Sequence, residues 1–199
     1  GQIKNNDSPD DVRDVDLTVV HVLSGPIWVN GAEPGDILVV DLLDIGALQG
    51  DEWGFTGIFD KKNGGGFLTD HYPNPAKAIW DFQGIYTSSR HIPGVKFAGI
   101  THPGLIGCAP SHELLAKWNK REAELQNSQP DVRTYGTGLA GDVPVLAALP
   151  NPTNAILGSL AKSDYERVAA EAARTVPPRE HGGNCDIKNL SRGTRIYFP

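Results

Sequence analysis

The run Ile37-Leu38-Val39-Val40-Asp41-Leu42-Leu43-Asp44-Ile45 is the most apolar stretch of this chain. It begins with β-branched residues and follows the turn sequence Glu33-Pro34-Gly35-Asp36. Nine residues of this kind bounded by turns favour a buried β-strand. Upstream, Asn30-Gly31 has the residue types of a type I′ turn, whose backbone requires positive φ. The block therefore predicts the beginning of a β-sandwich.

Two carboxylates, Asp41 and Asp44, interrupt this apolar run. Burying a carboxylate costs several kcal/mol unless it is paired or hydrogen-bonded. We therefore expect these residues at the end of a strand or facing a polar cleft.

The rest of the chain has the pattern of a β-rich protein with little helix. Apolar and β-branched runs predict strands at 17–22, 27–29, 80–82 and 194–198. One helix is expected from Ser111, its N-cap, to Gln126, and a second from Ser163, which forms a capping box with Glu166, to Thr175. The fold class expected is β-rich α+β, with a jelly-roll-like β-sandwich core, two short helices and long loops rich in glycine and proline.

Composition excludes several classes of partner. The 199 residues carry a net charge of −6, which argues against nucleic acid, since nucleic-acid binding requires a basic face. No run of eighteen apolar residues is present, so we expect no membrane span. The two cysteines, Cys108 and Cys185, are far apart and form no C-x-x-C pattern. This usage fits a reducing compartment, and a cytoplasmic protein is expected.

The two ends of the sequence suggest that residues 1–199 are one β-rich piece of a longer chain. There is no methionine, and the last residues, Tyr197-Phe198-Pro199, fall in what looks like a strand. Strand edges left open in such a piece pair with the remainder of the chain or with neighbouring molecules. We therefore expect contact with that remainder and a homo-oligomer.

Residue types used in catalysis and metal binding are concentrated in the segment 178–189, which reads Pro178-Arg179-Glu180-His181-Gly182-Gly183-Asn184-Cys185-Asp186-Ile187-Lys188-Asn189. The pair Gly182-Gly183 permits positive φ and the close approach of another group. A short polar segment bent by glycines and leading into a strand is where a scaffold tends to present chemistry. A turn with solvated polar residues is the alternative.

This segment resembles the motif of the acetamidase/formamidase family, in its formamidase-like branch. Further blocks carry the resemblance: Gln2-Ile3-Lys4-Asn5-Asn6-Asp7-Ser8, Gly25-Pro26-Ile27 with Gly31-Ala32-Glu33-Pro34-Gly35-Asp36, and His102-Pro103-Gly104-Leu105-Ile106-Gly107. The resemblance implies a longer chain that hydrolyses small aliphatic amides, such as formamide to formate and ammonia. It also implies a divalent metal, with zinc as the candidate.

Amide hydrolysis needs an activated water, an electrophile for the carbonyl oxygen and an acid for the leaving ammonia, and a metal can supply the first two. Asp186 is the expected base or metal ligand, with His102 as a second ligand. Lys188 is expected to stabilise the oxyanion, and Asn184 to donate to the carbonyl or to a metal ligand. The remaining roles are proton transfer by Glu52, beside the indole of Trp53, or by Glu180, and substrate binding by His181 and Gly183.

Two other functions remain open at this point. Cys185 or Cys108 could act as a nucleophile, which requires a depressed thiol pKa. A non-catalytic β-sandwich could instead bind carbohydrate by stacking sugars on tryptophans: Trp28, Trp53 and Trp80. The acidic residues at 7–16 could bind a cation, but they lack EF-hand spacing, and a solvated acidic loop is the favoured interpretation.

Overall fold

The computed structural model describes residues 1–128 and 149–199. The described residues form two compact units, one from 1–18, 47–99 and 123–128, the other from 19–46, 100–122 and 149–199. The helices are α1 (Asp10–Arg13), the 3₁₀ helix η1 (Leu17–Val19), α2 (His112–Ser128) and α3 (Lys162–Glu171). The strands are β1 (Leu38–Asp41), β2 (Trp53–Ile58), β3 (Ala76–Gln83), β4 (Tyr86–Ser89), β5 (Lys96–Ala98), β6 (Leu105–Gly107), β7 (Gly182–Asn184) and β8 (Arg195–Phe198).

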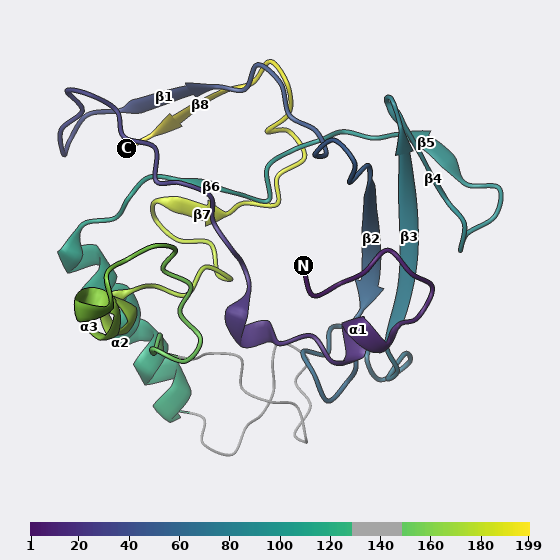
Figure 1. Ribbon diagram of the computed structural model, residues 1–199, viewed down its shortest axis with the longest axis horizontal. Helices are drawn as coiled ribbons and strands as arrows, with labels where there is room; N and C mark the ends of the chain where they lie inside the picture. The colour runs from purple at the N-terminus through teal and green to yellow at the C-terminus, as the bar shows by residue number, and fades with distance from the viewer. Residues whose placement is uncertain (129–148) are drawn as a thin grey trace. The chain divides into compact units, whose positions relative to one another are not determined.

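The first unit is built on an antiparallel sheet of four strands in the order β2-β3-β4-β5 (Figure 1). Its longest strand, β3, alternates buried and partly exposed side chains, as expected for a sheet with one covered face. Ile79 in this strand and Val12 in α1 are both fully buried. The small core of this unit therefore lies between the sheet and the N-terminal segment.

Strand β2 was missed because its sequence, Trp-Gly-Phe-Thr-Gly-Ile, is rich in glycine, which usually weakens a strand. The structure gives the reason for one of these glycines. A Cβ built on Gly54 would lie 2.9 Å from Cζ of Phe82, which comes from the paired strand β3. The glycine thus makes room for an aromatic ring of the neighbouring strand.

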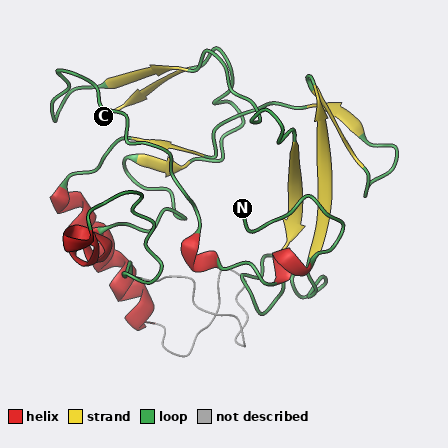
Figure 2. Cartoon of the chain, viewed as in Figure 1, coloured by secondary structure: helices red, strands yellow, loops and turns green. Residues whose placement is uncertain are grey.

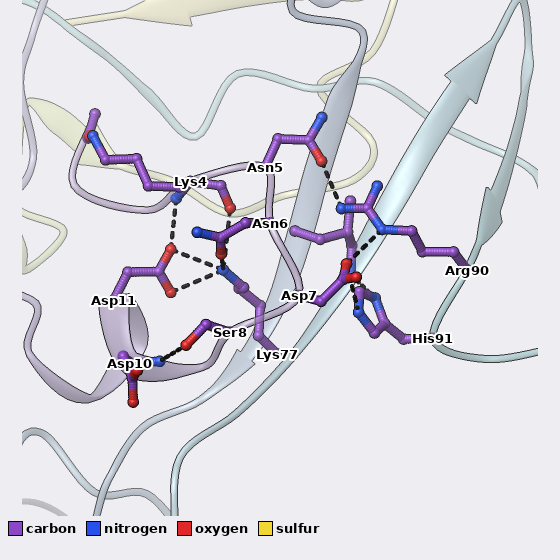
Figure 3. Close-up of polar contacts among 12 residues, drawn as sticks. Lys4, Asn5, Asn6, Asp7, Ser8, Asp10, Asp11, Lys77, Arg90 and His91 are labelled. Carbon is purple, nitrogen blue, oxygen red and sulfur yellow. Dashed lines mark hydrogen bonds and ion pairs between the residues drawn. The ribbon is translucent and has the colours of Figure 1, made fainter.

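The acidic N-terminal segment is held to β3 by a buried ammonium (Figure 3). The side chain of Lys77 is fully buried, and its Nζ donates to both carboxylate oxygens of Asp11, at 2.8 and 2.9 Å. It also donates to Oδ1 of Asn6 at 2.7 Å and to the carbonyl of Lys4 at 3.1 Å. At Asp11, therefore, the carboxylate pairs with an internal lysine.

In the second unit, β1 and β8 form a two-stranded antiparallel ladder in which Val39 is opposite Tyr197. The two carboxylates of the apolar run lie at its end, as expected. Asp41 is paired with Arg195 at 2.6 Å, and Asp44 is paired with Arg192. Both ion pairs are solvent-exposed, so the run avoids the cost of an unpaired buried carboxylate.

The two expected helices exist, with different caps. Ser111 caps α2, since its Oγ accepts from the N–H of Leu114 at 3.1 Å. The capping box predicted for the second helix is wrong: the N-cap of α3 is Ala161, two residues before Ser163, and it makes no side-chain cap. The helix ends at Glu171, before the predicted end at Thr175. Ser163 lies within the helix and its Oγ contacts Asp164 instead, at 3.4 Å.

The expected strands at 17–22 and 27–29 are wrong, because residues 17–19 form η1 and the residues from there to β1 join no strand. The predicted class is nevertheless confirmed: a β-rich α+β protein with several antiparallel sheets and few helices (Figure 2). The jelly-roll-like sandwich stays a prediction, since each unit is described by itself. Among the described residues, none of the helices combines the length and the apolar character needed to cross a membrane.

Candidate functional site

The motif at 178–189 is paired with the His102 block by the short antiparallel ladder of β6 and β7. Leu105 is opposite Asn184, and Gly107 is opposite Gly182. Beyond the strands, the N–H of Cys185 donates to the carbonyl of Gly104 at 2.8 Å. Two sequence blocks that lie far apart in the chain therefore meet at one place.

Glycines are required for this pairing. Gly182 has φ of 103°, and a Cβ there would lie 2.6 Å from the carbonyl oxygen of Ile106. A Cβ on Gly107 would lie 2.7 Å from the carbonyl oxygen of His181. Real Cβ atoms do not approach backbone so closely, so a larger residue at either position would push the two strands apart. The close approach that the sequence predicted for the Gly-Gly pair is confirmed.

The residues expected to carry the chemistry lie at the end of β7. Asp186 and Lys188 are both exposed. The His102 block comes close to Asp186 at Gly104, where a Cβ would be 3.8 Å from Oδ1 of Asp186. His102 is half-buried before β6, with Nδ1 3.2 Å from the carbonyl oxygen of Pro103. Asn184 uses an amide N–H to donate to the carbonyl of Val176 at 2.7 Å, which holds the loop before the motif.

Glu180 is an anchor in this structure. Its carboxylate accepts from the guanidinium of Arg121 and from the indole N–H of Trp118, both at 2.6 Å. The hydrogen bond from Arg121, a backbone hydrogen bond and the one from Trp118 lower the pKa of Glu180 to about 2. A carboxylate with so low a pKa is a weak base, and both of its oxygens already accept hydrogen bonds, so the structure argues against proton transfer by Glu180.

A buried ion network lies beside this anchor. Glu122 is almost fully buried and pairs with Arg174 at 2.7 Å and with Arg179 at 3.2 Å. The guanidinium of Arg179 also lies over the ring of Trp118, 5.1 Å from its centroid. Buried carboxylates are tolerated only when paired in this way, so the network fixes α2 against the segment that contains Arg174 and Arg179.

His181 packs against the same indole. Its ring centroid is 4.6 Å from that of Trp118, and its Nδ1 is buried without a hydrogen-bond partner among the described residues. Burial and the nearby charge of Arg179 lower the pKa of His181, although the charge of Glu180 opposes the shift. The imidazole is therefore neutral at neutral pH.

The substrate-binding role expected for Gly183 depends on the room beside the His181 ring that the absence of a side chain leaves. A Cβ on this residue would lie 3.1 Å from Cε1 and 3.5 Å from Nε2 of His181. The glycine therefore places no side chain over this edge of the imidazole.

Glu52 belongs to the first unit. It is exposed and accepts from the backbone N–H of Gly50 at 3.0 Å. The indole of Trp53 directs its N–H to Asp51 at 3.2 Å. Its assignment to proton transfer stays a prediction.

A metal centre needs more ligands than this region offers. Zinc sites in proteins use three or four protein ligands, and the expected ligands were Asp186 and His102. No group of three or more His, Cys, Asp or Glu side chains suited to a metal ion occurs within 1–128 and 149–199. These residues alone do not fit a complete zinc site, so no step below is routed through a metal.

The alternative functions gain no support from the site. Burial raises the pKa of the Cys108 thiol, which is the opposite of what a nucleophile requires. The side chain of Trp80 contacts residues of its own unit: its indole N–H donates to Thr56 at 2.9 Å, and its ring packs edge to face against Phe97. Trp28 is 85% exposed but belongs to the other unit.

The residues that surround the motif were not foreseen from the sequence. The helix predicted from Ser111 to Gln126 was given no role at the motif, yet Trp118, Arg121 and Glu122 of α2 hold the residues before β7. The available signal was the density of opposite charges in both segments. Charge alone does not specify which residues pair when about sixty positions separate them.

Comparisons with known proteins agree with the geometry. The family model described as the Acetamidase/Formamidase family matches residues 1–199. A formamidase of Methylophilus methylotrophus is 60% identical over 199 residues, and an acetamidase of Mycolicibacterium smegmatis is 56% identical over 207 residues. These alignments cover 100% of this chain but 46% and 48% of the relatives, so the chain spans about half their length.

A solved structure gives the same result. The gamma lactamase from Delftia acidovorans superposes with a TM-score of 0.91 at 59% identity, over 100% of this chain and 46% of that one. Similarity at this level over the whole chain confirms the family to which the motif at 178–189 pointed. The chain belongs to the acetamidase/formamidase family.

Proposed function

We propose that the protein hydrolyses small aliphatic amides, with formamide converted to formate and ammonia. The observation that carries the proposal is the ladder of β6 and β7, which joins the His102 block to Asp186 in a chain similar to amidases throughout its length. An exposed carboxylate and an exposed ammonium, Asp186 and Lys188, follow the ladder within three residues of each other. These are the groups that amide hydrolysis requires.

In the proposed reaction, Asp186 takes a proton from a water molecule, whose oxygen adds to the carboxamide carbon. Lys188 faces the negative charge that develops on the carbonyl oxygen. The C–N bond then breaks, and the nitrogen leaves as ammonia after receiving the proton. His181 binds the amide through the ring edge that Gly183 leaves free of a side chain.

The test is release of ammonia and formate from formamide, measured enzymatically for the purified protein. Acetamide and a γ-lactam serve as second substrates, since the solved relative is titled a gamma lactamase. We expect the linear amides to be hydrolysed. No ammonia from any of them would refute the proposal, and glycan binding without ammonia release would favour the carbohydrate-binding alternative.

Two variants of the same assay separate the mechanisms. Full activity of Cys185→Ser would dismiss a thiol nucleophile at that position. Loss of activity after chelation, with recovery on adding zinc, would indicate a metal whose further ligands lie outside the residues that the structure describes.

The proposal extends to assembly and location. Val39 and Tyr197, opposite each other in β1 and β8, are 47% and 60% exposed. A two-stranded ladder with an uncovered apolar face is marginally stable in water. We therefore propose contact with a further part of the chain or with a second copy, and light scattering should detect a homo-oligomer. The two cysteines are free thiols, which fits the proposed cytoplasmic location.

A further inference from the structure

Three consecutive residues at the start of the motif converge on one side chain of α2. Glu180 accepts from Nε1 of Trp118 at 2.6 Å, the guanidinium of Arg179 lies 5.1 Å from the indole centroid, and the imidazole of His181 lies 4.6 Å from it. Trp118 itself is 1% exposed. An isolated bridge between Arg179 and Gly182 closes the chain into a tight turn at this point, so the three side chains share one support.

We propose that Trp118 is a positioning residue, which holds the imidazole of His181 in place for the carboxamide by covering its ring and anchoring Glu180. The proposal rests on the proposed function, since it assigns Trp118 to the same site. Trp118 contacts no reacting atom in this scheme and acts through His181.

The support is specific in its geometry. The indole N–H and the indole face are used at the same time, the first by Glu180 and the second by His181 and Arg179. A leucine would fill part of the volume but supply neither contact. A phenylalanine would keep a ring face and lose only the hydrogen bond. These two substitutions therefore divide the role of Trp118 into its parts.

The imidazole of His181 is held in a partly buried site with few charged neighbours. The carbonyl oxygen of His181 accepts from the N–H of Cys108 at 3.1 Å, and its Nδ1 is buried. The charged groups around it are Arg179 and Glu180 on its own segment, with Arg121 and Glu122 paired to them from α2. Removing the indole gives water access to the imidazole, which favours the protonated form.

The experiment compares Trp118→Phe and Trp118→Leu in the purified protein. Trp80→Phe is the matched control, because it also deletes an indole hydrogen bond, the one to Thr56, in the other unit. The titration of His181 is followed by NMR of its ring carbons, and kcat and KM for formamide are measured against pH. Thermal unfolding of each variant shows whether it is folded.

For Trp118→Leu we expect His181 to titrate at higher pH than in the parent protein, and the acid limb of kcat/KM to move with it. KM should rise about tenfold, because a misplaced imidazole weakens binding of the amide. Trp118→Phe should show a smaller change of the same sign, and Trp80→Phe should show none.

Two results would overturn the proposal. One is an unchanged His181 titration in folded Trp118→Phe and Trp118→Leu. The other is a loss of kcat in both variants with no change in KM or in the acid limb. If Trp118→Leu does not fold, Trp118→Phe decides alone. The NMR titration needs no turnover, so a protein without amidase activity would refute the proposed function and leave the positioning of His181 to be judged separately.

Discussion

Replacing Lys77 by methionine should destabilise the protein strongly, although the two side chains have similar shape. The ammonium of Lys77 is fully buried and donates to Asp11, Asn6 and the carbonyl of Lys4 (Figure 3). Burial alone would raise the pKa of Asp11, but hydrogen bonds from Lys77 and from the backbone of Lys4 leave it below its ordinary value. The carboxylate is therefore ionised, and the variant leaves it mostly shielded from solvent, with its side chain 13% exposed, and without its cation.

The expected magnitude follows from this geometry. Removing one partner of a buried ion pair costs about 3–5 kcal/mol, because the remaining charge is uncompensated. For a protein of this size, that corresponds to a fall in Tm of roughly 6–20 °C. The assay is urea unfolding followed by circular dichroism, which reports the free energy of unfolding of each variant.

The chain provides a matched control in Lys61→Met. Lys61 pairs with Asp70 at 3.4 Å, but both side chains are about half exposed, so this variant should cost less than about 1 kcal/mol. The double variant Lys77→Met with Asp11→Leu should recover part of the lost stability, since it removes the unpaired charge. Equal effects of Lys77→Met and Lys61→Met would refute the reasoning.

Three further outcomes are expected. Because the pKa of Glu180 is lowered to about 2, its ion pair contributes stability that is complete above pH 4.5 and is lost as the pH falls toward 2. The free energy of unfolding, measured against pH in acid, should fall over this range. The Glu180→Gln variant should not show this fall. Gly107→Ala should destabilise the protein by about 1–3 kcal/mol through its clash with the backbone at His181, whereas Gly99→Ala, with no atom within 4 Å of its Cβ, should be neutral in the same urea assay. Arg179→Gln should raise the pKa of His181 and Glu180→Gln should lower it further, since their charges act in opposite directions; NMR shifts of the same sign for both would contradict the electrostatic account.

Much of the local structure could be predicted from the sequence where pattern and tertiary context agree. The strand at Arg195–Phe198 follows from β-branched and aromatic residues next to a turn sequence. The nine-residue buried strand predicted at 37–45 is only partly correct, since just Leu38–Asp41 is a strand and its side chains are not buried. The N-cap at Ser111 follows from the chemistry of serine at a helix start. Where the two disagree, prediction fails: Trp53–Ile58 is a strand despite its glycines, because one of them accommodates a ring of the neighbouring strand.

The candidate site was predicted only as a segment. The motif itself and its Gly-Gly pair were recognised, but its pairing with the His102 block was not predicted and is a finding of the structure. The role of Trp118 could not be predicted, because a buried tryptophan on an amphipathic helix has the same pattern whether it packs a core or holds a site. Long-range ion pairs such as Glu122 with Arg179 could not be predicted either, because the pairing of distant charges leaves no periodic signal in the sequence.

The account depends most on Asp186 as the group that activates water. The decisive measurement is the rate of ammonia release from formamide by Asp186→Ala, compared with Asp70→Ala, which removes an exposed carboxylate from the other unit. We expect Asp186→Ala to lose at least about 100-fold in kcat, the contribution of a general base, and Asp70→Ala to retain the parent rate. A folded Asp186→Ala variant that releases ammonia at the parent rate would contradict the central claim.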